Sequence, residues 1–351
     1  MTLLQKTCEA ILPVDPEAAA QAQLRLDAKT KPRRSLGMLE DLACRLAAIY
    51  RTASPPLPDK AVVVMAGDHG VAEEGVSAYP AEVTAQMVHN FAAGGAAINV
   101  LARQVGARIV VVDMGTKAAS VPKSVRDERL GAGTQNMTRG SAMSHEIAVR
   151  ALETGIRLAG ELASEGIGLI AVGDMGIGNT TAASAITAVL TKTTVDQVTG
   201  RGTGIDGEQL QRKITAVKRA LESNKLKSHD PLDVLAKVGG FEIGGLAGIL
   251  LGAAAHHVPV VLDGFITGAA ALIAVGLCSR VPDYLIAGHR SAEPGHAVIL
   301  RHLELQPLLD LHLRLGEGTG AVLAMILVEA AQRILGEMAT FSSAGVSDSG
   351  A

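Results

Sequence analysis

The stretch Ala61-Val62-Val63-Val64-Met65-Ala66-Gly67-Asp68-His69-Gly70 decides the fold class of this chain. Its first six residues are all apolar and include a run of three valines. A glycine and two polar residues follow directly. A strand that is apolar at every position, without alternation, is typical of a parallel sheet covered on both faces. The stretch therefore predicts a central strand of an α/β protein, with a polar turn at the carboxyl end of that strand.

Similar short apolar runs, most of them rich in β-branched residues, recur further along the chain, and each ends in a polar or glycine-rich turn. These runs are residues 108–112, 169–172, 258–262 and 284–287. Helical patterns lie between them, at residues 81–104, 145–165, 208–221 and 244–255. Strands that alternate with helices predict an α/β fold with a mostly parallel sheet and helices on both faces.

Helical patterns also flank this α/β region. Residues 1–55 are predicted to be helical and end in the linker Ser54-Pro55-Pro56-Leu57-Pro58, because proline cannot sit in a helix interior. From about residue 303 the chain returns to helix. We therefore expect a large α/β domain over residues 56–302 and a small helical domain formed by residues 1–55 and 303–345. Residues 346–351 are expected to form a flexible tail.

The composition argues against several classes of protein. The net charge of −3 gives no electrostatic case for nucleic-acid binding. The cysteines, Cys8, Cys44 and Cys278, are odd in number and lack CxxC spacing, so they favour a reducing cytoplasm over a disulfide framework or a zinc site. His256 and His257 are adjacent, and no HxxxH or HExxH pattern occurs, so we expect no metal ion.

The apolar runs do not predict a membrane span. Residues 246–255 are too few, and residues 258–278 are interrupted by Asp263 and several glycines, whereas a span needs roughly 20 largely apolar residues. The first ten residues carry Lys6 and Glu9 and have no apolar signal core, so no export signal is expected. The sequence therefore predicts a cytoplasmic protein.

Polar residues collect at the predicted carboxyl ends of the strands, where ligands of open α/β sheets bind. They are Asp68, His69, Asp113, Asp174, Asp263 and His289. An aspartate after a strand is usually a turn or helix N-cap residue. Because so many of these residues lie beside glycine, we favour a functional edge.

A second stretch, Arg314-Leu315-Gly316-Glu317-Gly318-Thr319-Gly320, isolates one carboxylate among glycines. Leucines precede it, and an apolar helical pattern over residues 321–331 follows, so we expect a tight turn between two buried elements. Partial desolvation there would raise the pKa of Glu317 and suit a general base that works near neutral pH. A helix connection in which Glu317 faces water is an equally good interpretation of this stretch alone.

A possible phosphate cradle is Gly173-Asp174-Met175-Gly176-Ile177-Gly178-Asn179-Thr180-Thr181, which follows a strand and opens a helix predicted over residues 182–190. Backbone N–H groups and the side chains of residues 179–181 would face an anion at the positive end of that helix. The GKS/T ending of a P-loop is missing, so hydrolysis of a nucleoside triphosphate is not indicated. A plain turn is the alternative.

The stretch Gly202-Thr203-Gly204-Ile205-Asp206-Gly207 matches the dinucleotide-binding pattern GxGxxG, but the segments around it do not match the rest of that motif. Residues 195–199 before it are too polar for a strong strand, and Glu222 falls inside a helical stretch instead of at a strand end. We expect at most an anion-binding loop helped by Lys213, with a solvated helix lysine as the alternative.

Seven motifs, in their order along nearly the full chain, resemble those of the nicotinate-nucleotide–dimethylbenzimidazole phosphoribosyltransferase family. They are Lys31-Pro32-Arg33-Arg34-Ser35-Leu36-Gly37, Gly67-Asp68-His69-Gly70-Val71, residues 173–181, Lys237-Val238-Gly239-Gly240-Phe241, Leu262-Asp263-Gly264-Phe265, His289-Arg290-Ser291-Ala292-Glu293 and residues 314–320. The resemblance implies a homodimer, with a Rossmann-like nucleotide-binding domain and a small domain from both chain ends. It also implies a reaction without metal or cofactor, in which nicotinate mononucleotide and 5,6-dimethylbenzimidazole give α-ribazole 5′-phosphate, the nucleotide of the cobalamin lower loop.

The resemblance also implies roles for individual residues. Glu317 matches the general base. Positions near the phosphate, ribose and nicotinate of the nucleotide are Asn179, Thr180, Gly202, Lys213 and Ser291. Tyr79 and Met87 fall on the segment that shapes the benzimidazole pocket, and the remaining predicted substrate-binding residues are Asp174, Gly176, Asp263 and Leu315.

The chain departs from the family pattern in two places. Asp174 stands where the best-known members carry glutamate, so its carboxylate reaches about one methylene less far, and Arg33-Arg34 replaces a more usual pair. Two other classes of protein stay open on this sequence. One is a different glycosyl-transfer enzyme that accepts another base, such as adenine or a phenol. The other is a nucleotide sensor without catalysis, which would have no use for Glu317.

Overall fold

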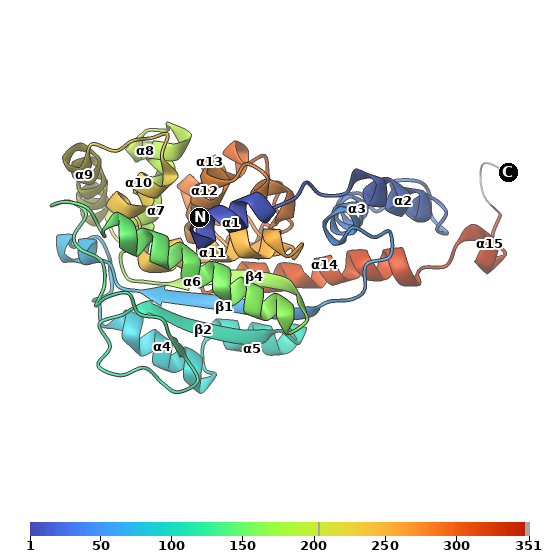
Figure 1. Ribbon diagram of the computed structural model, residues 1–351, viewed down its shortest axis with the longest axis horizontal. Helices are drawn as coiled ribbons and strands as arrows, with labels where there is room; N and C mark the ends of the chain where they lie inside the picture. The colour runs from blue at the N-terminus through green and yellow to red at the C-terminus, as the bar shows by residue number, and fades with distance from the viewer. Residues whose placement is uncertain (203, 348–351) are drawn as a thin grey trace.

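The computed structural model describes residues 1–202 and 204–347, and within them a six-stranded parallel sheet carries helices on both faces (Figure 1). The strands are β1 (Asp59–Gly67), β2 (Arg108–Gly115), β3 (Arg126–Asp127), β4 (Ile167–Met175), β5 (Val260–Leu262) and β6 (Leu285–Ala287). Their order is β3-β2-β1-β4-β5-β6, and every neighbouring pair is parallel. This is the strand order of a Rossmann-like sheet, so the predicted fold class is confirmed.

The strands are buried on both faces, as their continuous apolar runs predict. In β1, Ala61, Val63 and Met65 belong to one hydrophobic cluster, whereas the alternate residues Val62, Val64 and Ala66 belong to the other. Every predicted strand is present. The two-residue edge strand β3 was not predicted, because two residues are too few to form a pattern.

Helices separate into two layers (Figure 1). One face of the sheet carries α6 (His145–Ser164), α7 (Asn179–Thr191), α10 (Pro231–Val238), α11 (Phe241–Ala255) and α12 (Phe265–Leu277). The other face carries α4 (Val83–Ala93), α5 (Ala97–Val105) and the first part of α14 (Thr319–Glu337). The remaining elements are α1 (Leu3–Ala10), α2 (Pro16–Asp27), α3 (Met38–Tyr50), η1 (Gly70–Glu74), α8 (Val195–Val198), α9 (Gly207–Asn224), η2 (Val281–Tyr284), α13 (Pro294–His302) and α15 (Phe341–Ala344).

The helical pattern predicted over residues 81–104 is interrupted and forms two helices, α4 and α5. Gly94 has a φ of 81° in the left-handed region and ends α4. Before the GxGxxG pattern lies the short helix α8, so the strand that a dinucleotide site needs is absent there, as predicted. Thr203, the second residue of that pattern, lies outside the described residues.

The two chain ends meet beyond the sheet. Helices α2 and α3 pack against α14, and Figure 1 shows α2, α3 and α15 together at one end of the molecule. Helix α1 instead packs against α6 and α11. The division into domains at residues 56 and 303 stays a prediction. Residues 348–351 of the expected tail lie outside the described residues.

Within the described part of the chain, α14 is the helix whose length and apolar composition would allow it to cross a membrane. More than half of its most apolar 18-residue stretch is buried inside the molecule. There α14 packs against α3, α5 and β4. This is the environment of a core helix.

Candidate functional site

Glu317 lies in a tight turn that rests directly on β4. Glu317 itself has a φ of 62°, and the glycines on both sides also adopt the left-handed region. The backbone N–H of Glu317 donates to the carbonyl oxygen of Asp174 at 3.2 Å. A Cβ at Gly173 would lie 2.3 Å from the carbonyl carbon of Glu317, so this close approach requires glycine on the strand.

The carboxylate of Glu317 is buried, with 5% of the residue exposed. Its Oε2 accepts a hydrogen bond from the backbone N–H of Ile98, at 3.3 Å. Burial raises the pKa of Glu317, the Ile98 N–H opposes that change, and the charge of Asp263 raises the pKa further. The interpretation in which Glu317 faces water is therefore wrong.

The expectation that two buried elements flank this turn is wrong in part. Helix α14 follows the turn and is largely buried, but the preceding segment has no regular structure. Leu311 and Leu315 on that segment are 52% and 59% exposed. Their apolar character does not bury them, because the segment runs over the surface before it reaches α14.

Asp263 supports the same turn from behind. Its Oδ2 accepts the backbone N–H of Gly318 at 3.2 Å, and its Oδ1 accepts those of Gly320 at 2.7 Å and Ala321 at 3.0 Å. His289 approaches Oδ1 at 3.4 Å. Asp263 thus satisfies the first N–H groups of α14, which a residue at the end of β5 is placed to do. We interpret Asp263 as a positioning residue instead of a direct substrate contact.

Asp174, at the end of β4, is also buried. Asn179 donates to its Oδ2 at 2.8 Å. Burial raises the pKa of Asp174 well above its usual range, nearby Asp263 and Glu242 raise it further, and the Asn179 contact opposes them. The side chain of Asn179 therefore binds Asp174 in this structure.

Most of the predicted substrate-binding residues line one pocket at the carboxyl ends of β4, β5 and β6, which we call the carboxyl-edge pocket. The predicted residues in its wall are Asp174, Gly176, Asn179, Thr180, Gly202, Ser291 and Leu315. Further lining comes from Met175, Ile177, Gly264, Phe265, Ile266, His289, Glu293, Arg314 and Gly316. In a sheet of this strand order, ligands bind at this edge, beside the point where the order reverses between β1 and β4.

Lys213 reaches the wall of this pocket from α9 and is almost completely buried. Its Nζ donates to Oγ1 of Thr180 at 2.7 Å and to the carbonyl oxygen of Gly200 at 3.2 Å. Burial lowers the pKa of Lys213 to about 8, although Glu293 opposes the change. Within the described residues, no carboxylate lies within ion-pair distance of Nζ. The solvated-lysine interpretation is wrong, and the site is suited to an anion.

Tyr79 and Met87 do not line this pocket. Tyr79 is 54% exposed in the segment before α4, and Met87 is half-buried on α4. Helix α4 is nevertheless joined to the pocket, because Oγ1 of Thr84 accepts the backbone N–H of Ile177 at 3.1 Å.

The sequence did not single out three residues that take part in this site. Ile98 acts through its backbone N–H, which no side-chain pattern reveals. Glu293 accepts the N–H of Gly202 at 2.9 Å, and His296 accepts the N–H of Ser291 at 2.9 Å. Burial lowers the pKa of His296 to about 3. Glu293 belongs to the motif that begins at His289, and this motif is the one feature of the sequence from which its place in the site could have been predicted.

The other polar residues of the strand edge bind the protein itself. Asp113 accepts the N–H groups of Gly115 and Thr116, and Asp68 accepts that of Lys117. His69 pairs with Glu242 at 2.6 Å. For Asp68 and Asp113, the ordinary role of a turn residue is therefore the right one.

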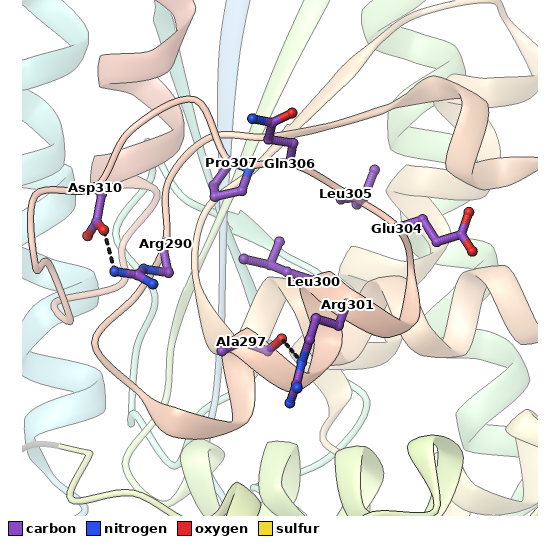
Figure 2. Close-up of a pocket in the computed structure, with 9 residues that line it drawn as sticks. All are labelled: Arg290, Ala297, Leu300, Arg301, Glu304, Leu305, Gln306, Pro307 and Asp310. Atoms are coloured by element: carbon purple, nitrogen blue, oxygen red, sulfur yellow. Dashed lines mark hydrogen bonds and ion pairs between the residues drawn. The ribbon is translucent and has the colours of Figure 1, made fainter.

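A separate, more open pocket lies between α13 and the segment that follows it (Figure 2). Its lining is Arg290, Ala297, Leu300, Arg301, Glu304, Leu305, Gln306, Pro307 and Asp310, and none of these is a predicted site residue. Arg290 pairs with Asp310 at one side of this pocket, so the positive charge of Arg290 is already partly neutralised. Residues 1–202 and 204–347 contain no group of three or more His, Cys, Asp or Glu placed to hold a metal ion.

Comparison with known proteins shows the family to which this chain belongs. A family described as "Phosphoribosyltransferase" matches residues 11–346. Nicotinate-nucleotide–dimethylbenzimidazole phosphoribosyltransferases from Chloroflexus aurantiacus and Desulforudis audaxviator are 56% and 57% identical to this chain, over 99% of both sequences in each case. The crystal structure of CobT from Thermus thermophilus superposes with a TM-score of 0.91 at 51% identity, covering 95% of this chain and 99% of that one. The chain therefore belongs to the nicotinate-nucleotide–dimethylbenzimidazole phosphoribosyltransferase family.

Proposed function

We propose that the protein transfers the phosphoribosyl group of nicotinate mononucleotide to 5,6-dimethylbenzimidazole. The products are α-ribazole 5′-phosphate and nicotinate, and the reaction belongs to the assembly of the cobalamin nucleotide loop. The observation that carries this proposal is the buried carboxylate of Glu317, in a turn whose neighbours Leu315 and Gly316 line the pocket that Lys213 backs.

The nucleotide would bind with its phosphate beside Lys213. The ammonium group of this lysine is desolvated and has only neutral oxygens as hydrogen-bond partners, so a phosphate would supply the missing negative charge. Thr180, Gly202 and Ser291 stand around the same volume and would contact the phosphate and ribose.

The base would bind on the Glu317 side, between this carboxylate and α4. Tyr79, Met87 and Leu315 would form the apolar walls there. A ring nitrogen of the benzimidazole attacks C1′ of the ribose from the face opposite nicotinate, so the configuration inverts from β to α. The C1′–N bond to nicotinate breaks, and its electron pair neutralises the pyridinium nitrogen.

The attacking nitrogen carries no proton, so the attack makes the ring cationic and the N–H of the other ring nitrogen acidic, and Glu317 accepts this proton. Its raised pKa makes it a better base than an exposed glutamate while it remains ionised. Holding two substrates in line contributes much of the rate, and the base adds roughly 10²–10⁴-fold. No step needs a metal ion or cofactor. We further propose that the enzyme is a cytoplasmic homodimer.

The test is to mix the purified protein with nicotinate mononucleotide and a panel of bases, and to follow nicotinate release and product mass by chromatography. Product with 5,6-dimethylbenzimidazole is expected. Turnover only with adenine or a phenol would assign a different glycosyl transfer, and binding without turnover would assign a nucleotide sensor. Sedimentation of the same sample measures whether the protein is a dimer.

A further inference from the structure

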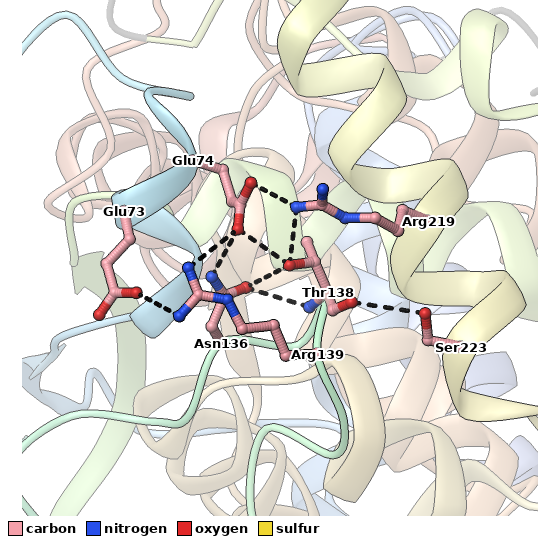
Figure 3. Close-up of polar contacts among 7 residues, drawn as sticks. All are labelled: Glu73, Glu74, Asn136, Thr138, Arg139, Arg219 and Ser223. Carbon is pink, nitrogen blue, oxygen red and sulfur yellow. Dashed lines mark hydrogen bonds and ion pairs between the residues drawn. The ribbon is translucent and has the colours of Figure 1, made fainter.

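A cluster of charged side chains joins three segments at the end of the molecule that carries α9 (Figures 1 and 3). Glu74, the last residue of η1, lies at its centre. The carboxylate accepts hydrogen bonds from Asn136 at 2.7 Å and from Thr138 at 3.0 Å, and it pairs closely with Arg219 of α9. Burial alone would raise the pKa of Glu74, but these contacts outweigh it and lower the pKa. The side chain is only 18% exposed, so this is a partly buried network.

Arg219 fixes the second half of α9. Its Nη2 donates both to Glu74 and to Oγ1 of Thr138, the latter at 2.9 Å. On the next turn, Asn224 donates to the carbonyl oxygen of Met137 at 2.8 Å. The first half of the same helix carries Lys213, whose position therefore depends on where these contacts hold the helix.

Glu74 is also connected to the wall of the pocket through η1. The N-cap residue of η1 is His69, and Gly178 packs directly on this segment. A Cβ at Gly178 would lie 3.3 Å from Cβ of His69 and 3.5 Å from the backbone nitrogen of Ala72. Because η1 backs the glycine turn that opens α7, the pair of Glu74 and Arg219 links that turn to the helix of Lys213.

We propose that Glu74 and Arg219 are positioning residues that set the affinity for the phosphate of the nucleotide. The inference rests on the proposed function of the carboxyl-edge pocket. Neither residue lines that pocket. They hold α9 against η1, so that Nζ of Lys213 stays within hydrogen-bond reach of Thr180 and of a phosphate beside it.

The test uses the substitutions Glu74→Gln, Arg219→Gln and Arg219→Lys in the full-length protein. Arg333→Gln is the matched control, because Arg333 is 48% exposed against 49% for Arg219 and pairs with Glu329 on α14, away from the pocket. KM for nicotinate mononucleotide, KM for the base and kcat are measured for each variant. Hydrogen exchange of the α9 amides is followed in parallel.

We expect Glu74→Gln and Arg219→Gln to raise KM for nicotinate mononucleotide by about three- to fivefold, the range for a partly exposed ion pair. KM for the base and kcat should stay near wild type, and exchange in α9 should become faster. Arg219→Lys should give an intermediate KM, because lysine keeps the charge but lacks the fork that reaches both Glu74 and Thr138. Arg333→Gln should change none of these.

Equal changes in both KM values, or a KM for the nucleotide that matches the control, would overturn the inference while the proposed function stands. If the wild-type protein forms no product, the proposed function fails instead. The positioning role is then decided by the affinity for inorganic phosphate and by α9 exchange. If both are unchanged in Glu74→Gln and Arg219→Gln, the role is refuted; weaker phosphate binding with faster exchange supports it.

Discussion

Oε2 of Glu317 accepts the backbone N–H of Ile98, a residue 219 positions earlier in the chain. Ile98 is the second residue of α5, so the carboxylate lies at the positive end of that helix. The helix end favours the charged form, whereas burial favours the neutral form. Since the net effect is a raised pKa, Glu317 is poised to exchange a proton closer to neutral pH than an exposed glutamate.

Glu317→Gln should remove the base and leave the fold intact. Glutamine is nearly isosteric, and its amide oxygen can still accept the N–H of Ile98. We expect kcat to fall by roughly 10²–10⁴-fold with little change in either KM. The kcat of the wild type should also fall at acid pH as Glu317 becomes protonated, and we call this fall the acid limb. The residual kcat of the variant should lack the acid limb. Near-wild-type kcat would exclude Glu317, and Asp174 and Asp263 would be tested next.

Asp263→Asn should shift the acid limb of kcat to lower pH. The negative charge of Asp263 raises the pKa of Glu317, so a neutral residue there lets Glu317 stay ionised in more acidic solution. The asparagine amide group would also face the N–H of Gly318, which leaves a donor without an acceptor and costs about 1–3 kcal/mol of folding free energy. The pH profile and denaturant unfolding measure the two effects. An unchanged acid limb would show that Asp263 acts on the backbone only.

Lys213→Ala should weaken nicotinate mononucleotide far more than the base. Loss of a charged hydrogen bond to the phosphate corresponds to ~1.5–3 kcal/mol in the nucleotide KM. In wild type, this KM should also rise as the pH passes about 8, because Lys213 loses its charge there. The alanine variant should lack that rise. If instead only the KM of the base changed, the two subsites would be reversed.

Asp174→Asn should alter how stability depends on pH. The folded state raises the pKa of Asp174 well above 3.8, so above that pH the folded protein holds a proton that the unfolded chain has released. Stability from this group is therefore full at low pH and falls as pH rises toward the folded-state pKa, by up to about 1.4 kcal/mol per pH unit. The asparagine variant should lose this component of the decline. Identical slopes in denaturant unfolding from pH 5 to 8 would contradict a protonated Asp174.

The sequence predicts the fold well because each strand of the sheet, except the two-residue β3, is marked by its own short apolar run. The single helix predicted over residues 81–104 is wrong, because Gly94 ends α4 although the apolar pattern continues past it. Burial of single side chains is harder to predict. Leu311 and Leu315 are apolar but exposed, and Lys213 is charged but buried, because tertiary contacts decide which segment covers them.

In the site too, the sequence predicts residues that lie close together in the chain better than contacts between distant segments. Asp174 lies at the end of one strand, Asn179 and Thr180 follow that strand, and all three line one pocket, as the pattern predicts. The partners of Glu317 come from Ile98 and Asp263, which are far away in sequence and act through backbone groups or on them. The sequence singles out Asp263 by its motif, but it does not show which backbone groups Asp263 and Glu317 bind, since these contacts arise only when the helices have packed on the sheet.

The position of the Glu317 turn has a consequence for the order in which the protein becomes complete during synthesis. Among the described residues, the last strand ends at Ala287, whereas the turn and α14 come from the final part of the chain. A ribosome that has released the chain only to β6 has delivered the six strands of the sheet and the glycine turn after β4, but not the carboxylate. Chains cut short in this region hold most of the residues that line the carboxyl-edge pocket and none of the turn that carries Glu317. An intact C-terminal segment therefore matters more to this protein than its small share of the mass suggests.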